Sequence, residues 1–110
     1  MEFLLLICND PTGEEYTPAD DNIEEWVEEV MSSGVRLHGN RLHPVDHAKT
    51  VRRRRGKLVV TDGPFADTKE RIGGFDLIEC DDLDEAIAVA SKHPMAQFGC
   101  VEVRPIWPFE

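Results

Sequence analysis

The chain has 110 residues, which is the length of one domain with a hydrophobic core of modest size. Twenty-two acidic residues against twelve basic ones give a formal net charge of −10, and the sequence pI is near 4.7. Such a charge repels phosphate backbones and anionic lipid surfaces, so nucleic acids and membranes are excluded as expected partners. We therefore expect a single domain over residues 1–110.

The first predicted element is a strand from Phe3 to Cys8, which is apolar at every position. A continuous apolar run of this length predicts a strand that is covered on both faces. The run is too short for a signal peptide or a membrane span. The cysteines, Cys8, Cys80 and Cys100, lack the spacing of metal ligands. These features indicate a cytoplasmic protein with reduced thiols.

A helix is predicted next, with Thr17 as its N-cap, Pro18 at its first position and Gly34 as its C-terminal stop. One apolar stripe has helical spacing and consists of Ile23, Trp26, Val27, Val30 and Met31. Glutamates occupy the opposite side. The pattern predicts an amphipathic helix that packs its apolar stripe on the rest of the domain.

The segment 35–42 follows as a predicted strand in which apolar and polar residues alternate. We expect Val35 and Leu37 to face the helices. The opposite face of the strand would then carry Arg36, His38 and Asn40.

A hairpin is predicted from Lys49 to Arg54 and from Lys57 to Thr61, with its turn at Arg55-Gly56. Arg52, Arg53, Arg54, Arg55 and Lys57 form its basic run. This run has two interpretations. It is either the solvated, edge-protecting surface of the hairpin or a contact for an anion or a partner protein.

Two further strands are predicted, from Phe75 to Cys80 and from Cys100 to Ile106. Between them, Asp82 and Glu85 form the capping box of a second helix. The predicted buried stripe of this helix is Leu83, Ala86, Ile87 and Ala90. The residues expected to favour its negative C-terminal end are Lys92 and His93.

The order of these elements is strand, helix, strand, hairpin, strand, helix, strand. It predicts an α+β fold of the ferredoxin-like βαββαβ type with an inserted β-hairpin. Two helices can cover only one face of the four-stranded sheet. The other face carries Leu or Phe residues of the first strand whichever way that strand is turned. We therefore expect a homodimer in which a second subunit covers this face.

Several motifs occur in an order and spacing that identify a family. They are Val60-Thr61-Asp62-Gly63-Pro64-Phe65, Thr68-Lys69-Glu70, Gly73-Gly74-Phe75-Asp76-Leu77-Ile78-Glu79, Asp82-Leu83-Asp84-Glu85-Ala86 and Val101-Glu102-Val103-Arg104-Pro105-Ile106. Over nearly its whole length, the chain resembles the YCII-related proteins of the DGPF type. The resemblance implies a dimeric α+β barrel, a bacterial origin and, in many relatives, a genomic association with extracytoplasmic-function sigma factors.

The resemblance also implies a cleft in which a His and an Asp have been proposed as catalytic residues. The His of such relatives lies in the first helix, and residues 23–31 of this chain contain none. Asp62 matches the characteristic acidic position of the family. The turn from Asp62 to Phe65 has a structural interpretation as a rigid turn, and a functional one as a cleft wall with a carboxylate acceptor and an apolar ring.

Strand alternation provides a second candidate site. If the polar faces of three strands align, one side of the sheet carries His38, Asp76, Glu102 and Arg104. These residues either bind a ligand or form ion pairs between subunits. A His beside a carboxylate is the minimum for acid–base catalysis.

Three functions are compatible with these features. The first is binding of a small polar or anionic metabolite by a homodimer, with Asp62, Phe65, Asp76 and Arg104 as ligand-binding residues. The second is an enzyme with His38 and either Asp62 or Asp76 as acid and base. The third is an accessory protein of a sigma factor that binds through the basic run of the hairpin. No motif for a metal or a cofactor is found.

Overall fold

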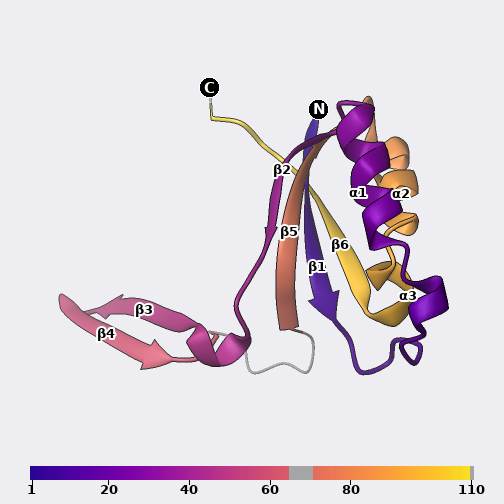
Figure 1. The fold of residues 1–110 in the computed structure, drawn as a ribbon. Coiled ribbons are helices and arrows are strands. Elements are labelled where there is room, and N and C mark those ends of the chain that lie inside the picture. Colours follow the sequence, from indigo (N-terminus) through magenta and orange to yellow (C-terminus); the bar gives the residue numbers. More distant parts are fainter. Residues whose placement is uncertain (65–70, 110) are drawn as a thin grey trace.

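Two helices lie on one face of a four-stranded sheet, and a two-stranded hairpin extends away from it (Figure 1). The computed structural model describes residues 1–64 and 71–109. The strands are β1 (Glu2–Asn9), β2 (Arg36–Arg41), β3 (Lys49–Arg54), β4 (Lys57–Asp62), β5 (Arg71–Glu79) and β6 (Cys100–Pro105). The helices are α1 (Ile23–Ser32), α2 (Leu83–Ser91) and the short α3 (Met95–Phe98), with 3-10 turns η1 (Pro18–Asp20) and η2 (Val45–His47).

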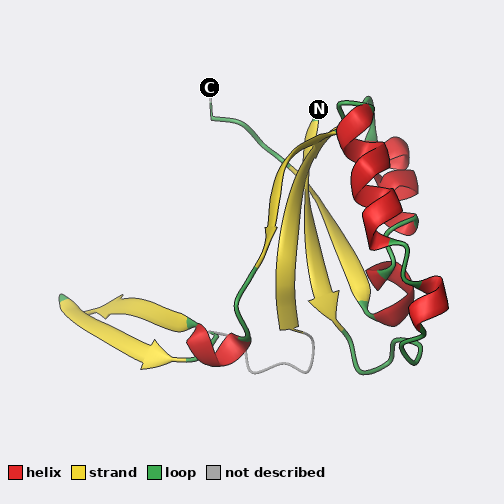
Figure 2. Cartoon of the chain, in the orientation of Figure 1, coloured by secondary structure: helices red, strands yellow, loops and turns green. Residues whose placement is uncertain are grey.

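The strands of the main sheet have the order β2-β5-β1-β6, and all neighbours are antiparallel. Helices α1 and α2 both cover the same face, as Figure 2 shows. This arrangement confirms the predicted α+β fold of the ferredoxin-like type with a hairpin inserted after its second strand. Among the described residues, no helix is both long enough and apolar enough to cross a membrane.

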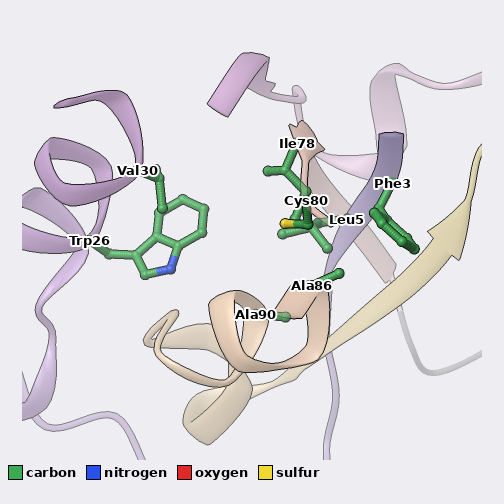
Figure 3. Close-up of a cluster of buried hydrophobic side chains, with 8 residues drawn as sticks. All are labelled: Phe3, Leu5, Trp26, Val30, Ile78, Cys80, Ala86 and Ala90. Carbon is green, nitrogen blue, oxygen red and sulfur yellow. The ribbon is translucent and has the colours of Figure 1, made fainter. Parts of the chain in front are cut away.

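The core lies between the sheet and the two helices (Figure 3). Phe3 and Leu5 of β1 and Ile78 of β5 are completely buried, and they pack with Trp26 of α1 and Ala86 of α2. Phe3 pairs with Ile78 across the strands, so both side chains point to the same face. Each fully buried side chain of this size contributes about 1.5–3 kcal/mol through the hydrophobic effect.

No helix of the described residues covers the other face of the sheet. Its apolar residues are Leu4, Leu6, Phe75 and Leu77, which are only partly buried. His38 and Asn40 flank them on β2, because His38 pairs with Leu77 and Asn40 with Phe75. We refer to this surface as the uncovered face.

The start of the first helix differs from the prediction. Thr17 and Pro18 open the turn η1, and α1 begins only at Ile23, after Asn22. The Thr17 hydroxyl donates to the Asp20 carboxylate at 2.7 Å and does not cap a helical N–H group. The chain therefore leaves the helical path after one turn.

The second helix has the predicted cap but not the predicted stripe. Asp82 accepts a hydrogen bond from the Glu85 N–H group at 2.8 Å, which confirms the cap. Ala86 and Ala90 are buried as expected, whereas Leu83 and Ile87 are 43% and 49% exposed. The helix thus packs on the core through its small alanines and Val89. In α1, Trp26 and Val30 are buried, but Met31 is 59% exposed.

The hairpin has the predicted strands and turn. Arg55 and Gly56 both have positive φ angles, 52° and 76°, which are typical of a tight two-residue turn between antiparallel strands. Strands β3 and β4 pair only with each other in the described sheets. Figure 1 shows them extending away from the helices.

Candidate ligand-binding cavity

A cavity of about 730 Å³ opens between the helical layer and the sheet. Its volume lies within the usual range for small-molecule sites. Its apolar wall includes Ile7, Ile23, Trp26, Val27 and Phe98. The cavity therefore lies on the helix-covered face of the sheet and is bounded by residues of both layers.

An ion pair lies on the sheet side of this cavity. The Arg36 Nε atom donates to Oδ1 of Asp76 at 2.7 Å, and Asp76 is only 6% exposed. Burial raises the pKa of Asp76, although the neighbouring Arg36 guanidinium acts in the opposite direction. Arg36 also contacts the Met31 sulfur from Nη1 at 3.8 Å. Oδ2 of Asp76 accepts no hydrogen bond from the described residues.

A β-bulge in β2 explains why Arg36 points into the cavity. Arg36 pairs with Ile78, whereas His38 pairs with Leu77, so the register shifts by one residue between them. Arg36 and His38 therefore lie on opposite faces of the sheet. The expectation that they share a face is wrong, because the bulge residue Leu37 breaks the alternation and is 47% exposed.

Gly39 makes room for the ion pair. A Cβ atom at this position would lie 2.0 Å from Oδ1 of Asp76 and 2.7 Å from Nη2 of Arg36. Any larger residue would displace both groups. The Cβ atom would also lie 2.7 Å from the backbone oxygen of Phe75, so the ion pair and the close approach of β5 both require glycine here.

His93 lines the cavity where α2 ends. It is 6% exposed, and its ring lies edge-on to the Trp26 ring, with centroids 4.6 Å apart. Its Nδ1 atom accepts a hydrogen bond from the Met95 N–H group at 3.0 Å. Burial lowers the pKa of His93 to about 4. His93 is therefore neutral near pH 7, and the expected role of a cation at the helix end is wrong.

The charged residues of the cavity differ in sign from the protein as a whole. Arg36, Arg41 and Arg71 line it against Asp21 and Asp76. The protein carries a net charge of −10, so a slight excess of positive charge is concentrated here. A small anion therefore meets a locally favourable field in this cavity.

The predicted site residues do not assemble in one place. Of His38, Asp62, Asp76 and Arg104, only Asp76 lines the cavity. His38 lies on the uncovered face, with its ring 5.7 Å from that of Phe75. The predicted polar stripe is confirmed for His38, Glu102 and Arg104, which share the uncovered face. It is wrong for Asp76, which lies on the opposite face.

The other predicted residues lie away from the cavity as well. Asp62 ends β4, is exposed and pairs with Lys49 of the same hairpin. Within the described parts of the chain, no hydrogen bond or ion pair joins Asp62 to His38. Arg104 pairs with Glu102 at 3.2 Å on the uncovered face. Phe65 lies outside the described residues.

The sequence interpretation missed the roles of Arg36 and His93. Trp26 and His93 were both assigned to helix packing or helix ends, which is the commoner role of such residues. A signal existed in Asp76, a carboxylate within an otherwise apolar predicted strand, because a buried charge is usually paired with an opposite charge. The bulge that brings them together has no comparable sequence signature.

The chain is similar to one curated protein in sequence and to one solved structure in fold. An uncharacterised protein of Rhizobium meliloti (strain 1021) is 47% identical over 68 residues, which are 60% of this chain and 55% of that protein. The likeness therefore spans about half of the relative's length. The second is a solved structure, 5-chloro-2-hydroxyhydroquinone dehydrochlorinase from Burkholderia phenoliruptrix AC1100 in complex with 2,5-dihydroxybenzoquinone.

The dehydrochlorinase has the same fold with little sequence similarity. The two chains share 17% identity with a TM-score of 0.50, over all of this chain and 96% of the other. The YCII-related domain itself matches residues 1–110. From its first residue to its last, the chain belongs to the YCII-related family.

Proposed function

We propose that this protein is a homodimer that binds a small, ring-containing organic anion in the cavity between α1 and the sheet. The observation that carries the proposal is Arg36, a cation that a bulge and Gly39 place against an apolar cavity. Its Nε atom donates to Asp76 and its Nη1 atom contacts the Met31 sulfur, while Arg36 itself lines the cavity. A guanidinium fixed in this way is preorganised to bind an anionic oxygen.

The shape and polarity of the cavity support a ring. Trp26, Ile23 and Val27 form a wall of aromatic and branched side chains on the helix side. Flat apolar surfaces of this kind favour planar ligands. The dehydrochlorinase, whose structure holds 2,5-dihydroxybenzoquinone, provides a fold-level analogy for such a ligand. A ring with charged or carbonyl oxygens is therefore the ligand class we propose.

The uncovered face supports the homodimer. Leu4, Leu6, Phe75 and Leu77 form a continuous apolar surface that no described helix covers. A surface of this kind in a protein of 12.4 kDa is commonly an interface between copies. Light scattering at micromolar concentration should give about twice the mass of one chain.

Isothermal titration calorimetry with 2,5-dihydroxybenzoquinone tests the proposed function. We expect binding by the wild-type protein, and 30- to 100-fold weaker binding, on the order of 2–3 kcal/mol, by Arg36→Gln. The matched control is His38→Gln, because His38 is two residues away on the opposite face. Absence of binding by the wild type, or equal affinities of wild type and Arg36→Gln, contradicts the proposal.

A second candidate function is acid–base catalysis on the bound ligand, with Asp76 as the group that takes up a proton. One observation favours it: Asp76 is buried in the cavity and its pKa is raised. Exchange of ligand protons with deuterium from the solvent, followed by NMR, measures this activity. Asp76→Asn should abolish the exchange but retain binding. If this variant still exchanges ligand protons at the wild-type rate, Asp76 does not have this role.

A further inference from the structure

His93 is a buried polar residue that neither the core nor the proposed anion contact explains. It lies where α2 ends and α3 begins, against Trp26, and it lines the cavity from the helix side. Arg36 lines the same cavity from the sheet side. Both walls of the cavity therefore carry a nitrogen-bearing side chain, and the two belong to different layers of the fold.

The hydrogen bond to Nδ1 determines which nitrogen of His93 carries the proton. The Met95 N–H group can only donate, so Nδ1 must have a free lone pair. A neutral imidazole then carries its single proton on Nε2. Protonation of Nδ1 would break this bond inside a largely buried site. Asp21, the charged group that acts on His93 from the side of α1, favours the protonated form, but burial outweighs it.

The Nε2–H group is left as a donor for something else. No described residue accepts a hydrogen bond from it. Because no buried side-chain nitrogen or oxygen of the described residues lacks a partner, the Nε2 atom reaches solvent, and its acceptor must lie there. Because His93 is 6% exposed and lines the cavity, an oxygen of a bound ligand can supply this acceptor.

We infer that His93 determines the specificity of the cavity by donating from Nε2 to a second acceptor oxygen of the ligand. This inference rests on the proposed function and narrows the ligand class. The ligand carries acceptor oxygens at two separate positions, one for Arg36 and one for His93. Carbonyl, phenolate and carboxylate oxygens fit, whereas ammonium and amide N–H groups meet two donors and are rejected.

Two substitutions of His93 separate binding from folding. In His93→Asn, the amide oxygen takes the place of Nδ1 and still accepts from the Met95 N–H group, but the Nε2 donor is gone. In His93→Gln, the longer amide places an N–H group near the position of Nε2 and loses the acceptor at Nδ1. The two variants therefore remove opposite halves of the imidazole.

Calorimetry with 2,5-dihydroxybenzoquinone and urea unfolding measure both halves. We expect affinity about tenfold weaker in His93→Asn, on a protein close to wild-type stability, and affinity within about threefold of wild type in His93→Gln, on a less stable protein. A packing role predicts the reverse order of affinities. Long-range ¹H–¹⁵N NMR correlations of the His93 ring report the tautomer independently.

Two outcomes would overturn the inference while leaving the proposed function intact. One is wild-type affinity in His93→Asn while Arg36→Gln still loses binding, which would place the Nε2–H group toward the outer groove near Gln97. The other is an Nδ1–H tautomer in the NMR spectrum. If the wild-type protein itself does not bind 2,5-dihydroxybenzoquinone, the proposed function is refuted instead.

Discussion

The two faces of the main sheet differ in what they bury, although the same strands form both. On the covered face, the chain buries a charged pair, Arg36 and Asp76, next to an apolar core. On the uncovered face, Phe75 and Leu77, the immediate neighbours of Asp76, are left only partly buried. One residue along β5 thus separates a ligand-binding wall from a surface that favours association. Position on a face, and not residue type alone, therefore determines the role of each side chain.

The largest effect is expected from a charge on the uncovered face. Leu77→Asp places a carboxylate among Leu4, Leu6 and Phe75, which a partner subunit would bury. We predict that the mass measured by light scattering falls from about twice 12.4 kDa to 12.4 kDa. Leu83→Asp on the outer side of α2, where Leu83 is 43% exposed, is the control and should not change the mass. A monomeric wild type would refute the dimer.

The covered face predicts a dependence of stability on acid. The pKa of His93 is about 4 in the folded protein and 6.5 as a free group, so the unfolded chain binds the proton more readily. The stability that comes from burying a neutral His93 is therefore fully present above about pH 6.5 and is lost as the pH falls toward 4. We expect a loss of about 2–3 kcal/mol from this group in urea unfolding.

The carboxylates of the protein also titrate in acid, so a variant is needed to isolate the effect of His93. His93→Asn removes the titrating imidazole and leaves the carboxylates in place. Its unfolding free energy should depend less steeply on pH between 4 and 6.5 than that of the wild type. Parallel curves for the two proteins would mean that His93 is not buried as a neutral group.

Two glycine-to-alanine substitutions test whether the Arg36–Asp76 ion pair needs the space beside Gly39. Gly39→Ala should destabilise the protein by about 1–3 kcal/mol, because its Cβ atom would lie 2.0 Å from Oδ1 of Asp76. Gly73→Ala, on the neighbouring strand β5, meets no atom closer than 3.8 Å and should change stability by less than about 0.5 kcal/mol. Equal urea midpoints for the two variants would show that the pair moves aside without cost.

The smallest effect is expected in the hairpin. Arg53 is exposed on β3, pairs with Leu58 and takes no part in the cavity. Arg53→Gln should leave ligand affinity and stability within experimental error. The association with a sigma factor remains a prediction, and a pulldown with the arginines of the hairpin reversed in charge tests it separately.

Much of the fold could be predicted because its signals are local. Continuous apolar residues mark β1, Arg55-Gly56 marks the hairpin turn, and Asp82 with Glu85 marks the start of α2. The need to cover a second apolar face also follows from β1 alone. Each of these features depends on residues that are close together in the chain, so a single sequence is enough to predict it.

The candidate site could not be predicted because it depends on register. The alternation of Asp76 with Phe75 and Leu77 was correct, but their faces were exchanged. Polar residues were expected to gather away from the helices, whereas Asp76 is buried beneath them with Arg36 as its partner. The bulge at Leu37 results from the pairing of β2 with β5, and no residue type within β2 predicts it.

The most direct test of this account is a methyl NMR titration of the protein with 2,5-dihydroxybenzoquinone. The methyl groups of Ile23 and Val27 line the cavity, and those of Leu4 and Leu6 lie on the uncovered face. We predict saturable shifts of Ile23 and Val27, which need a roughly 30- to 100-fold higher ligand concentration in Arg36→Gln, with Leu4 and Leu6 unchanged. Shifts confined to Leu4 and Leu6, or no saturable shift at any of these residues, would contradict a ligand site on the covered face.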